Sequence, residues 1–155
     1  MKSTFTYFLY GMVILCSTGI FFPAFAQKKK SISFSVTMPK PATHQLQVTM
    51  SCTGFKADSI EFKMPAWTPG YYQLLNFAEY VGDFQVKGNE DQSLSWRKSS
   101  KNGWMVQIKG HPSFLITYSI TAAVPFVAKN YVDSNRAFIS PPGTFLYPDQ
   151  QLNTS

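Results

Sequence analysis

The chain has 155 residues, a formal net charge of +6, and only two histidines and two cysteines. Once the N-terminal leader described next is set aside, this length suits one domain with a modest core and is too short for two. Lys28, Lys29 and Lys30 carry much of the positive charge as a short tail without interleaved aromatic residues. The charge therefore does not predict nucleic-acid binding.

The first 26 residues have the pattern of a signal peptide. Lys2 supplies the positive charge, residues 8–22 supply the apolar run, and Ala24-Phe25-Ala26 supply the small residues that a signal peptidase requires. We expect the mature chain to begin at Gln27 with a basic tail over residues 27–30. This predicts an exported protein, periplasmic or extracellular, that keeps no membrane attachment after cleavage.

Two other uses of the N-terminal region stay open. One is a permanent anchor helix, because the apolar run approaches the length that spans a bilayer. The other, a weaker alternative, is lipid attachment at Cys16, where Leu15 stands in place of a small residue. If Cys16 leaves with the leader, Cys52 is alone in the mature chain and no internal disulfide can form. Cys52 lies on the apolar side of an alternating strand, so its thiol is predicted to be buried.

We expect the domain to cover residues 31–148. In its first half, strict alternation of apolar and polar residues predicts strands. A first strand is expected over residues 31–38. A second, over residues 44–53, alternates without a break. A third follows a turn at residues 54–58 and places three apolar side chains on one face: Ile60, Phe62 and Met64.

Residues 64–72, Met-Pro-Ala-Trp-Thr-Pro-Gly-Tyr-Tyr, combine two prolines, a glycine and three large aromatics. The prolines fix φ and lack a donor, and Gly70 permits a turn, so a stiff and non-helical connection is predicted. Such a connection can hold Trp67, Tyr71 and Tyr72 against a neighbouring surface at low entropic cost. That property serves internal packing and recognition of a partner equally well.

The middle of the chain continues in short strands. Residues 72–80 fit a helical turn as well as an extended stretch, and the pattern does not choose between them. Polar turns and an Asn-Gly hairpin signal at Asn102 separate the segments that follow. Strands are predicted over residues 81–86, 94–97, 104–108 and 114–120.

The last part of the chain mixes aromatic residues with turn formers. We expect residues 125–147 to form a long structured loop with short strand pieces, and residues 149–155 to be a polar tail or a truncation point. Strands spaced by about ten residues predict an all-β fold, an antiparallel β-sandwich. If the chain is truncated, the sandwich lacks its last strands, exposes an unpaired edge and aggregates readily.

Residues for enzyme chemistry are sparse. His44 and His111 each stand alone, without the second histidine and the glutamate of a catalytic zinc motif, so no metal site is predicted. No nucleophile elbow and no phosphate-binding glycine loop occurs in the sequence. Glu79 and Asp133 stand out among the carboxylates because aromatics flank both, but solvated or structural roles are expected for them. The sequence therefore predicts no catalytic residue and no cofactor.

Three segments together resemble the N-terminal domain of glycyl aminopeptidases. They are residues 65–72, Phe77-Ala78 and residues 131–141, the last containing Tyr-Val-Asp. The family consists of exported zinc metallopeptidases with an N-terminal β-sandwich, a thermolysin-like catalytic domain that carries His-Glu-x-x-His, and a PDZ domain. The resemblance covers residues 31–148. Many members have an Arg-Glu or Arg-Asp pair where this chain has Leu75-Asn76, so no role is transferred to that pair.

The resemblance implies a non-catalytic N-terminal domain of such a peptidase, inactive alone, in a chain truncated before its zinc-binding catalytic domain. Its implied partners are that catalytic domain and a peptide substrate. The side chains expected either to line the cleft or to fill the open end of the sandwich are Trp67, Tyr71, Tyr72, Tyr131 and Asp133. Two alternatives are an independent secreted binding module, which would take peptide or carbohydrate on the aromatic loop, and a small hydrolase.

Overall fold

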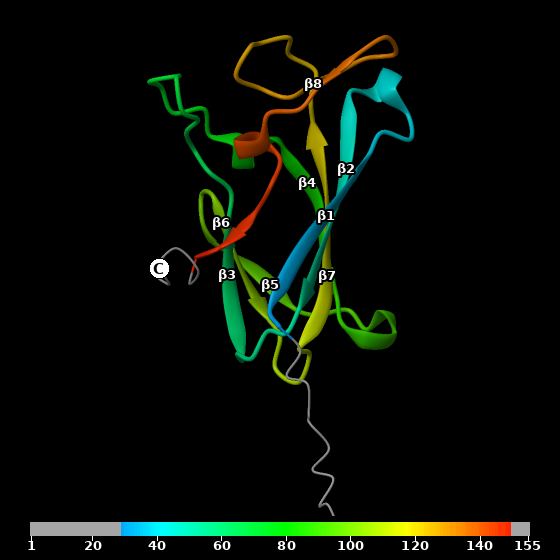
Figure 1. Ribbon diagram of the computed structural model, residues 1–155, viewed down its shortest axis with the longest axis vertical. Helices are drawn as coiled ribbons and strands as arrows, with labels where there is room; N and C mark the ends of the chain where they lie inside the picture. The colour runs from blue at the N-terminus through cyan, green and yellow to red at the C-terminus, as the bar shows by residue number, and fades with distance from the viewer. Residues whose placement is uncertain (1–28, 150–155) are drawn as a thin grey trace, which may run out of the picture.

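The computed structural model describes residues 29–149, so the predicted signal peptide lies outside the described residues. Two four-stranded antiparallel sheets pack face to face (Figure 1). In spatial order the first sheet contains β1 (Ser31–Thr37), β2 (Gln45–Thr53), β7 (Ser113–Thr121) and β4 (Val81–Lys87). The second contains β10 (Tyr147–Pro148), β3 (Ser59–Lys63), β6 (Gly103–Gln107) and β5 (Trp96–Ser100). The predicted all-β sandwich is confirmed.

Short elements complete the described part of the chain. The strands β8 (Tyr131–Val132) and β9 (Ala137–Phe138) form a separate hairpin. The helical segments are single 3-10 turns: η1 (Pro41–Thr43), η2 (Phe77–Tyr80), η3 (Asn89–Asp91) and η4 (Pro141–Gly143). The stretch before β4 thus ends in a helical turn. Between residues 29 and 149 no helix has the length and apolarity to cross a membrane.

The central strands follow the alternation in the sequence. β2 and β7 pair along all nine residues of each strand, from Gln45 opposite Thr121 to Thr53 opposite Ser113. Alternate side chains of β2 are buried, among them Cys52, as its phase predicted. Because the side-chain period of a strand is two, this register fixes which face of the sheet enters the core.

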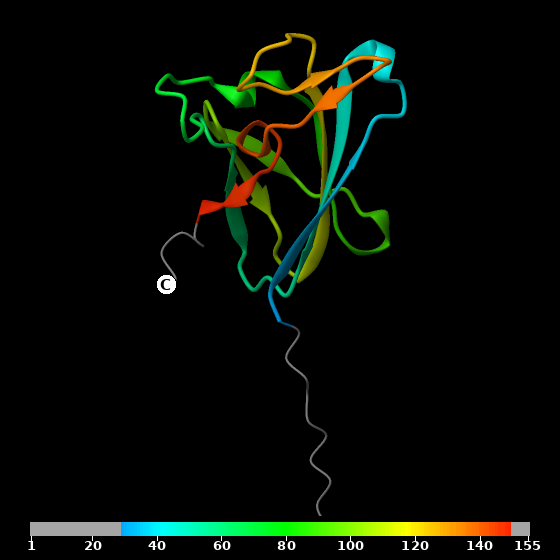
Figure 2. The ribbon, with the colours of Figure 1, turned by 45° about the horizontal axis from the view of Figure 1, so that its top comes forward.

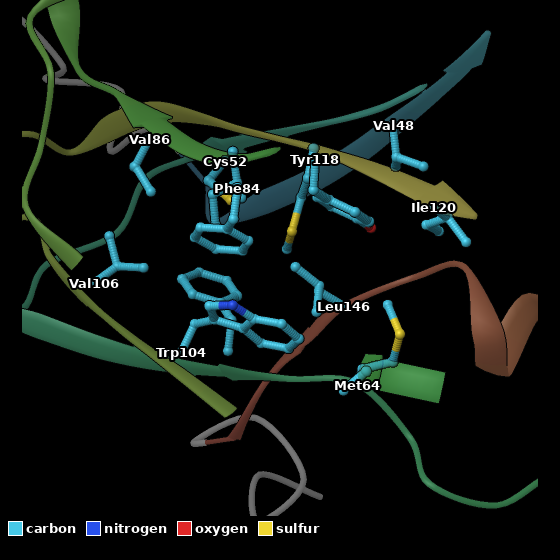
Figure 3. Packing of buried hydrophobic residues seen from close by; sticks show 14 of the residues in the cluster. Val48, Cys52, Met64, Phe84, Val86, Trp104, Val106, Tyr118, Ile120 and Leu146 are labelled. Carbon is cyan, nitrogen blue, oxygen red and sulfur yellow. The ribbon is translucent and has the colours of Figure 1, made fainter. Parts of the chain in front are cut away.

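Stacked rings join the two sheets in the core (Figure 3). The Phe84 ring of β4 lies parallel to the Trp104 ring of β6, with centroids 5.3 Å apart and planes at 6°. The Tyr118 ring of β7 is 6.3 Å from the Phe84 ring. Fully burying one such side chain stabilises the fold by roughly 1.5–3 kcal/mol. The core therefore lies between the sheets, and the loops beyond it carry no part of this stack.

The strand predicted over residues 94–97 begins later than expected, because β5 starts at Trp96. Leu94 is buried, but its N–H donates to the carbonyl oxygen of Val86 on β4, at 2.9 Å. Ser93 likewise forms an isolated bridge with Lys87. These residues therefore pair with the first sheet before the chain crosses to the second.

Three loops gather at one end of the sandwich, at the top of Figures 1 and 2. They are residues 66–76, between β3 and η2; residues 123–130, between β7 and β8; and the β8–β9 hairpin with its turn. We call this region the loop end. It contains all five side chains that the sequence suggested for binding.

Candidate interface at the loop end

The proline-rich segment is built as a tight turn. Pro69 and Gly70 occupy its two central positions, Gly70 has φ +83°, and the Tyr71 N–H donates to the Thr68 carbonyl oxygen at 3.2 Å. This is the geometry of a type II turn, in which a residue with positive φ follows proline. The Leu75 N–H then donates to the Ala66 carbonyl oxygen at 2.8 Å and closes the loop. The connection is non-helical, as the prolines predicted.

The two consecutive tyrosines of this loop differ in burial. Tyr71 is half-buried, and its ring meets the Phe126 ring edge to face, with centroids 5.3 Å apart and planes at 78°. Its hydroxyl lies 3.4 Å from Gln73 Oε1. Tyr72 instead leaves 92% of its surface exposed. Tyr71 therefore attaches the loop to residues 123–130, while Tyr72 projects into solvent.

Large apolar side chains are exposed on all three loops of the loop end. Exposed apolar surface that is concentrated in one region of a soluble protein is typical of an interaction site, whereas single exposed apolar residues are common. The Tyr71–Phe126 contact joins the first loop to the second, and Phe126 and Val127 share a groove with Phe138 of the hairpin. The exposed members are Trp67, Tyr72, Leu74, Val124, Val127 and Phe138. We call these six side chains the apolar patch.

Asp133 organises the turn of the β8–β9 hairpin. Its carboxylate accepts hydrogen bonds from the Tyr131 hydroxyl at 2.7 Å and from the N–H groups of Asn135 and Arg136, at 2.7 and 2.8 Å. These donors favour the charged form and hold the pKa of Asp133 below its usual range, the Tyr131 hydroxyl most strongly. The same bond raises the pKa of Tyr131. Two of the suggested binding residues thus hold each other in place.

A shallow groove separates residues 125–127 from the hairpin. Its volume is about 450 Å³, and most of the side chains that line it are apolar. Arg136 is the charged residue of the lining. The Arg136 guanidinium lies 5.3 Å from the centre of the Tyr131 ring, within the range of a cation–π contact. The groove therefore offers an apolar floor with one cationic group beside it.

A buried hydrogen-bond network supports the loops from beneath. The Asn130 side chain donates to the Gly143 carbonyl oxygen at 2.8 Å, and its Oδ1 accepts from the Ser140 N–H at 2.7 Å and from the Thr144 hydroxyl at 2.9 Å. Tyr118 donates to the Thr144 carbonyl oxygen at 2.7 Å. This network ties residues 123–130 to η4 and to the core. Asn130 was not predicted from the sequence, because an asparagine between loop residues carries no mark of burial.

The other candidate residues do not converge on a reactive group. His44 lies at the end of η1 and contacts the Val132 carbonyl oxygen, while His111 lies in the turn before β7, against Gly88. The Glu79 side chain is exposed. In residues 29–149 no three His, Cys, Asp or Glu side chains come together in a way that would hold a metal ion. These residues do not fit the zinc site of a metallopeptidase.

Fold and loop end together define a β-sandwich domain that exposes large apolar side chains at one end. The chain belongs to the family of peptidase M61 N-terminal domains, whose model matches residues 33–155. It is the N-terminal domain of a peptidase. The expected resemblance to this class is confirmed.

A solved structure has the same fold. It is an aminopeptidase N family protein from Idiomarina loihiensis, with a TM-score of 0.72 and 21% sequence identity. The match covers 78% of this chain and 20% of that protein, so the chain spans about a fifth of its length. No curated protein matches the chain.

Proposed function

We propose that this domain serves an exported, glycyl-aminopeptidase-like zinc metallopeptidase by packing its loop end on the catalytic domain, beside the substrate cleft. The observation that carries the proposal is the apolar patch, six exposed side chains on three loops at one end of the sandwich. In this arrangement the catalytic domain holds the zinc ion and the His-Glu-x-x-His motif. The sandwich supplies a wall of the cleft.

The burial of the individual side chains supports an external partner. Tyr72 and Leu74 expose 92% and 72% of their surfaces, so neither stabilises the isolated sandwich through packing. Covering apolar surface is favourable by about 25 cal/mol per Å², and a partner domain would gain that energy at both residues. The turn at Pro69 and Gly70 is already ordered, so little conformational entropy is lost when a partner binds.

The polar groups beside the patch suit a position at the edge of the cleft. Tyr131 lines the groove, and its hydroxyl donates a hydrogen bond to Asp133, which fixes both side chains. Fixed polar groups around an apolar floor are typical of sites that orient a ligand. A peptide substrate running between the two domains would pass these groups.

Export is part of the proposal. The charged start at Lys2, the apolar run over residues 8–22 and the Ala24-Phe25-Ala26 site support cleavage before Gln27. The domain and its peptidase then act in the periplasm or outside the cell. The measurement is the N-terminal mass of protein expressed from the full gene in a bacterial host. An N-terminus at Met1 would contradict export by this route.

Binding in trans tests the docking surface. The chain, expressed in full, is mixed with a separately produced segment of a glycyl-aminopeptidase-like family member that contains its catalytic and PDZ domains. We expect the two to co-sediment, and we expect the chain to increase the rate at which the segment releases para-nitroaniline from glycine para-nitroanilide. Replacing Tyr72→Ser together with Leu74→Ser should weaken the complex by about tenfold or more, since a few side chains that are buried in the complex, often tyrosines, carry most of the binding energy.

Leu115→Ser is the matched control, because Leu115 is an exposed leucine near the start of β7, away from the loop end. It should leave the affinity unchanged. A chain that does not bind, or that loses equal affinity in both variants, would refute docking through the loop end. A chain that ignores the catalytic segment but binds short peptides or oligosaccharides would establish the independent binding module instead.

A further inference from the structure

Three of the four outer strands of the sandwich carry features that prevent edge-to-edge pairing. β4 has a register shift between Gly82 and Gln85. β5 has a register shift and carries Arg97 and Lys98. β10 has two residues, and one of them is Pro148. Bulges, charges, prolines and short length are the usual protections of a sheet edge.

β1 has none of these protections. It pairs with β2 in unbroken register from Ser31 opposite Thr53 to Thr37 opposite Gln47, and it contains no charged residue, proline or glycine. In an antiparallel pair alternate residues direct their N–H and C=O groups away from the neighbouring strand. Among residues 29–149 no other strand or backbone group is hydrogen-bonded to this outer edge of β1. An unprotected edge of this length is a template for another strand.

The sequence of β1 is nearly the same in both directions. Forward it is Ser-Ile-Ser-Phe-Ser-Val-Thr, and backward Thr-Val-Ser-Phe-Ser-Ile-Ser, with Phe34 at the centre. Two copies paired antiparallel about Phe34 would place Ile32 opposite Val36 and Ser33 opposite Ser35. Every apolar side chain then faces an apolar one, and every hydroxyl faces a hydroxyl. Such cross-strand matches stabilise a sheet.

We propose that the outer edge of β1 pairs with β1 of a second copy of this chain, in antiparallel register about Phe34, so that the two four-stranded sheets become one eight-stranded sheet. The contact is isologous, because the same strand serves both copies, and it closes after two chains. Phe34 is 37% exposed and touches Phe145 with ring centroids 4.7 Å apart. The second Phe34 would cover the exposed part of this ring.

The ends of the strand limit the contact to these seven residues. Lys29 and Lys30 precede β1, and Pro39 with Lys40 follows it closely. A single strand pair is small beside standard interfaces of about 1,600 Å², so we expect a reversible dimer with a Kd of about 10 to 100 µM. This inference is independent of the proposed function, because β1 runs along the side of the sandwich and contains no residue of the apolar patch.

Sedimentation velocity of the full chain, over a range of concentrations, measures the dimer. Replacing Ser33→Lys together with Ser35→Lys places ammonium groups opposite each other in both symmetric pairs. Like charges directly opposite destabilise a pair of strands, so the dissociation constant should rise by about tenfold or more. The Glu version, Ser33→Glu with Ser35→Glu, should be monomeric for the same reason. A mixture of the two variants should dimerise again, because each ammonium then faces a carboxylate.

Gln85→Lys is the matched control. Gln85 lies on the same rung of the sheet as Ser35, through Thr117 and Thr49, but at the opposite edge. This variant should dimerise like the unchanged chain, as should Tyr72→Ser with Leu74→Ser. A chain that stays monomeric near 1 mM, far above the expected Kd, would overturn the proposal. So would a dimer that survives the Ser33 and Ser35 lysines, or a Lys and Glu mixture that stays monomeric.

Discussion

The Tyr71 ring meets the Phe126 ring edge to face, with centroids 5.3 Å apart and planes at 78°. The contact joins the turn at Pro69 and Gly70 to residues 123–130, which the Asn130 network attaches to η4. The next residue along the chain, Tyr72, is 92% exposed. One tyrosine therefore holds the loop in position, and its neighbour is available to a partner.

This division predicts different effects on stability. Tyr71→Ala should lower the free energy of unfolding by about 1 to 3 kcal/mol, because it removes an aromatic pair and leaves Phe126 more exposed. Tyr72→Ala should change it by less than about 0.5 kcal/mol, since an exposed side chain contributes little. Urea denaturation followed by tryptophan fluorescence measures both. Equal losses in the two variants would contradict the assignment.

Alanine and asparagine should rank in opposite orders when they replace Gly143 and when they replace Gly70. Asparagine should be the more destabilising residue at position 143 and the less destabilising one at position 70. At Gly143 a Cβ would lie 2.8 Å from Cδ1 of the buried Phe77, so Gly143→Ala should cost about 1 to 3 kcal/mol by overpacking, and Gly143→Asn should cost more. At Gly70 a Cβ meets no atom within 4 Å, and only its positive φ opposes a side chain. Asparagine tolerates that conformation, so Gly70→Asn should be less harmful than Gly70→Ala. The thermal midpoints of the four variants test this prediction. It would be contradicted if alanine and asparagine had the same order of thermal midpoints at both positions.

Acid should loosen the β8–β9 turn through Asp133. Its pKa is lowered in the folded state, so the stabilisation is complete above the ordinary aspartate value of about 3.9 and is lost as the pH falls through the lowered pKa. Asp133→Asn lacks the charge at every pH. The difference in thermal midpoint between the chain and this variant should therefore be largest near neutral pH and shrink towards pH 2. A difference that stays constant with pH would show that the charge is unimportant.

The limits of a strand were predictable from the sequence where the alternating stretch of residues coincides with the stretch that pairs with neighbouring strands. β2 and β7 lie centrally, so their period of two describes both the buried face and the extent of the ladder. At residues 93–96 the pattern predicted a strand from residue 94, but it did not show which strand each residue pairs with. Leu94 bonds to Val86 in the first sheet, whereas Trp96 pairs with Val106 in the second. Periodicity records which side of a strand is apolar and carries no information on which strand lies beside it.

The loop end was predictable in composition but not in detail. Prolines and glycine indicate the turn at residues 68–71, yet adjacent aromatics such as Tyr71 and Tyr72 point in directions set by the turn and by Phe126, far along the chain. The exposure of Leu74 and Val127 was not predicted either. An apolar residue in a loop is expected to pack somewhere, and only the fold shows that these two do not.

The reactivity of the thiols tests the core and the leader together. Cys52 is 1% exposed, and burial raises the pKa of its thiol to about 12. Because the thiolate is the reactive form, the folded, exported chain should give almost no reaction with Ellman's reagent at neutral pH.

The sequence has two cysteines, and Cys16 lies in the predicted leader. After cleavage before Gln27, one thiol per chain should therefore react in urea, and retention of the leader would give two. A Cys52→Ser variant identifies the source, because it should remove the signal of the cleaved chain completely. Rapid reaction of the folded chain, traced to Cys52 by its loss in this variant, would contradict the burial of β2 in the core.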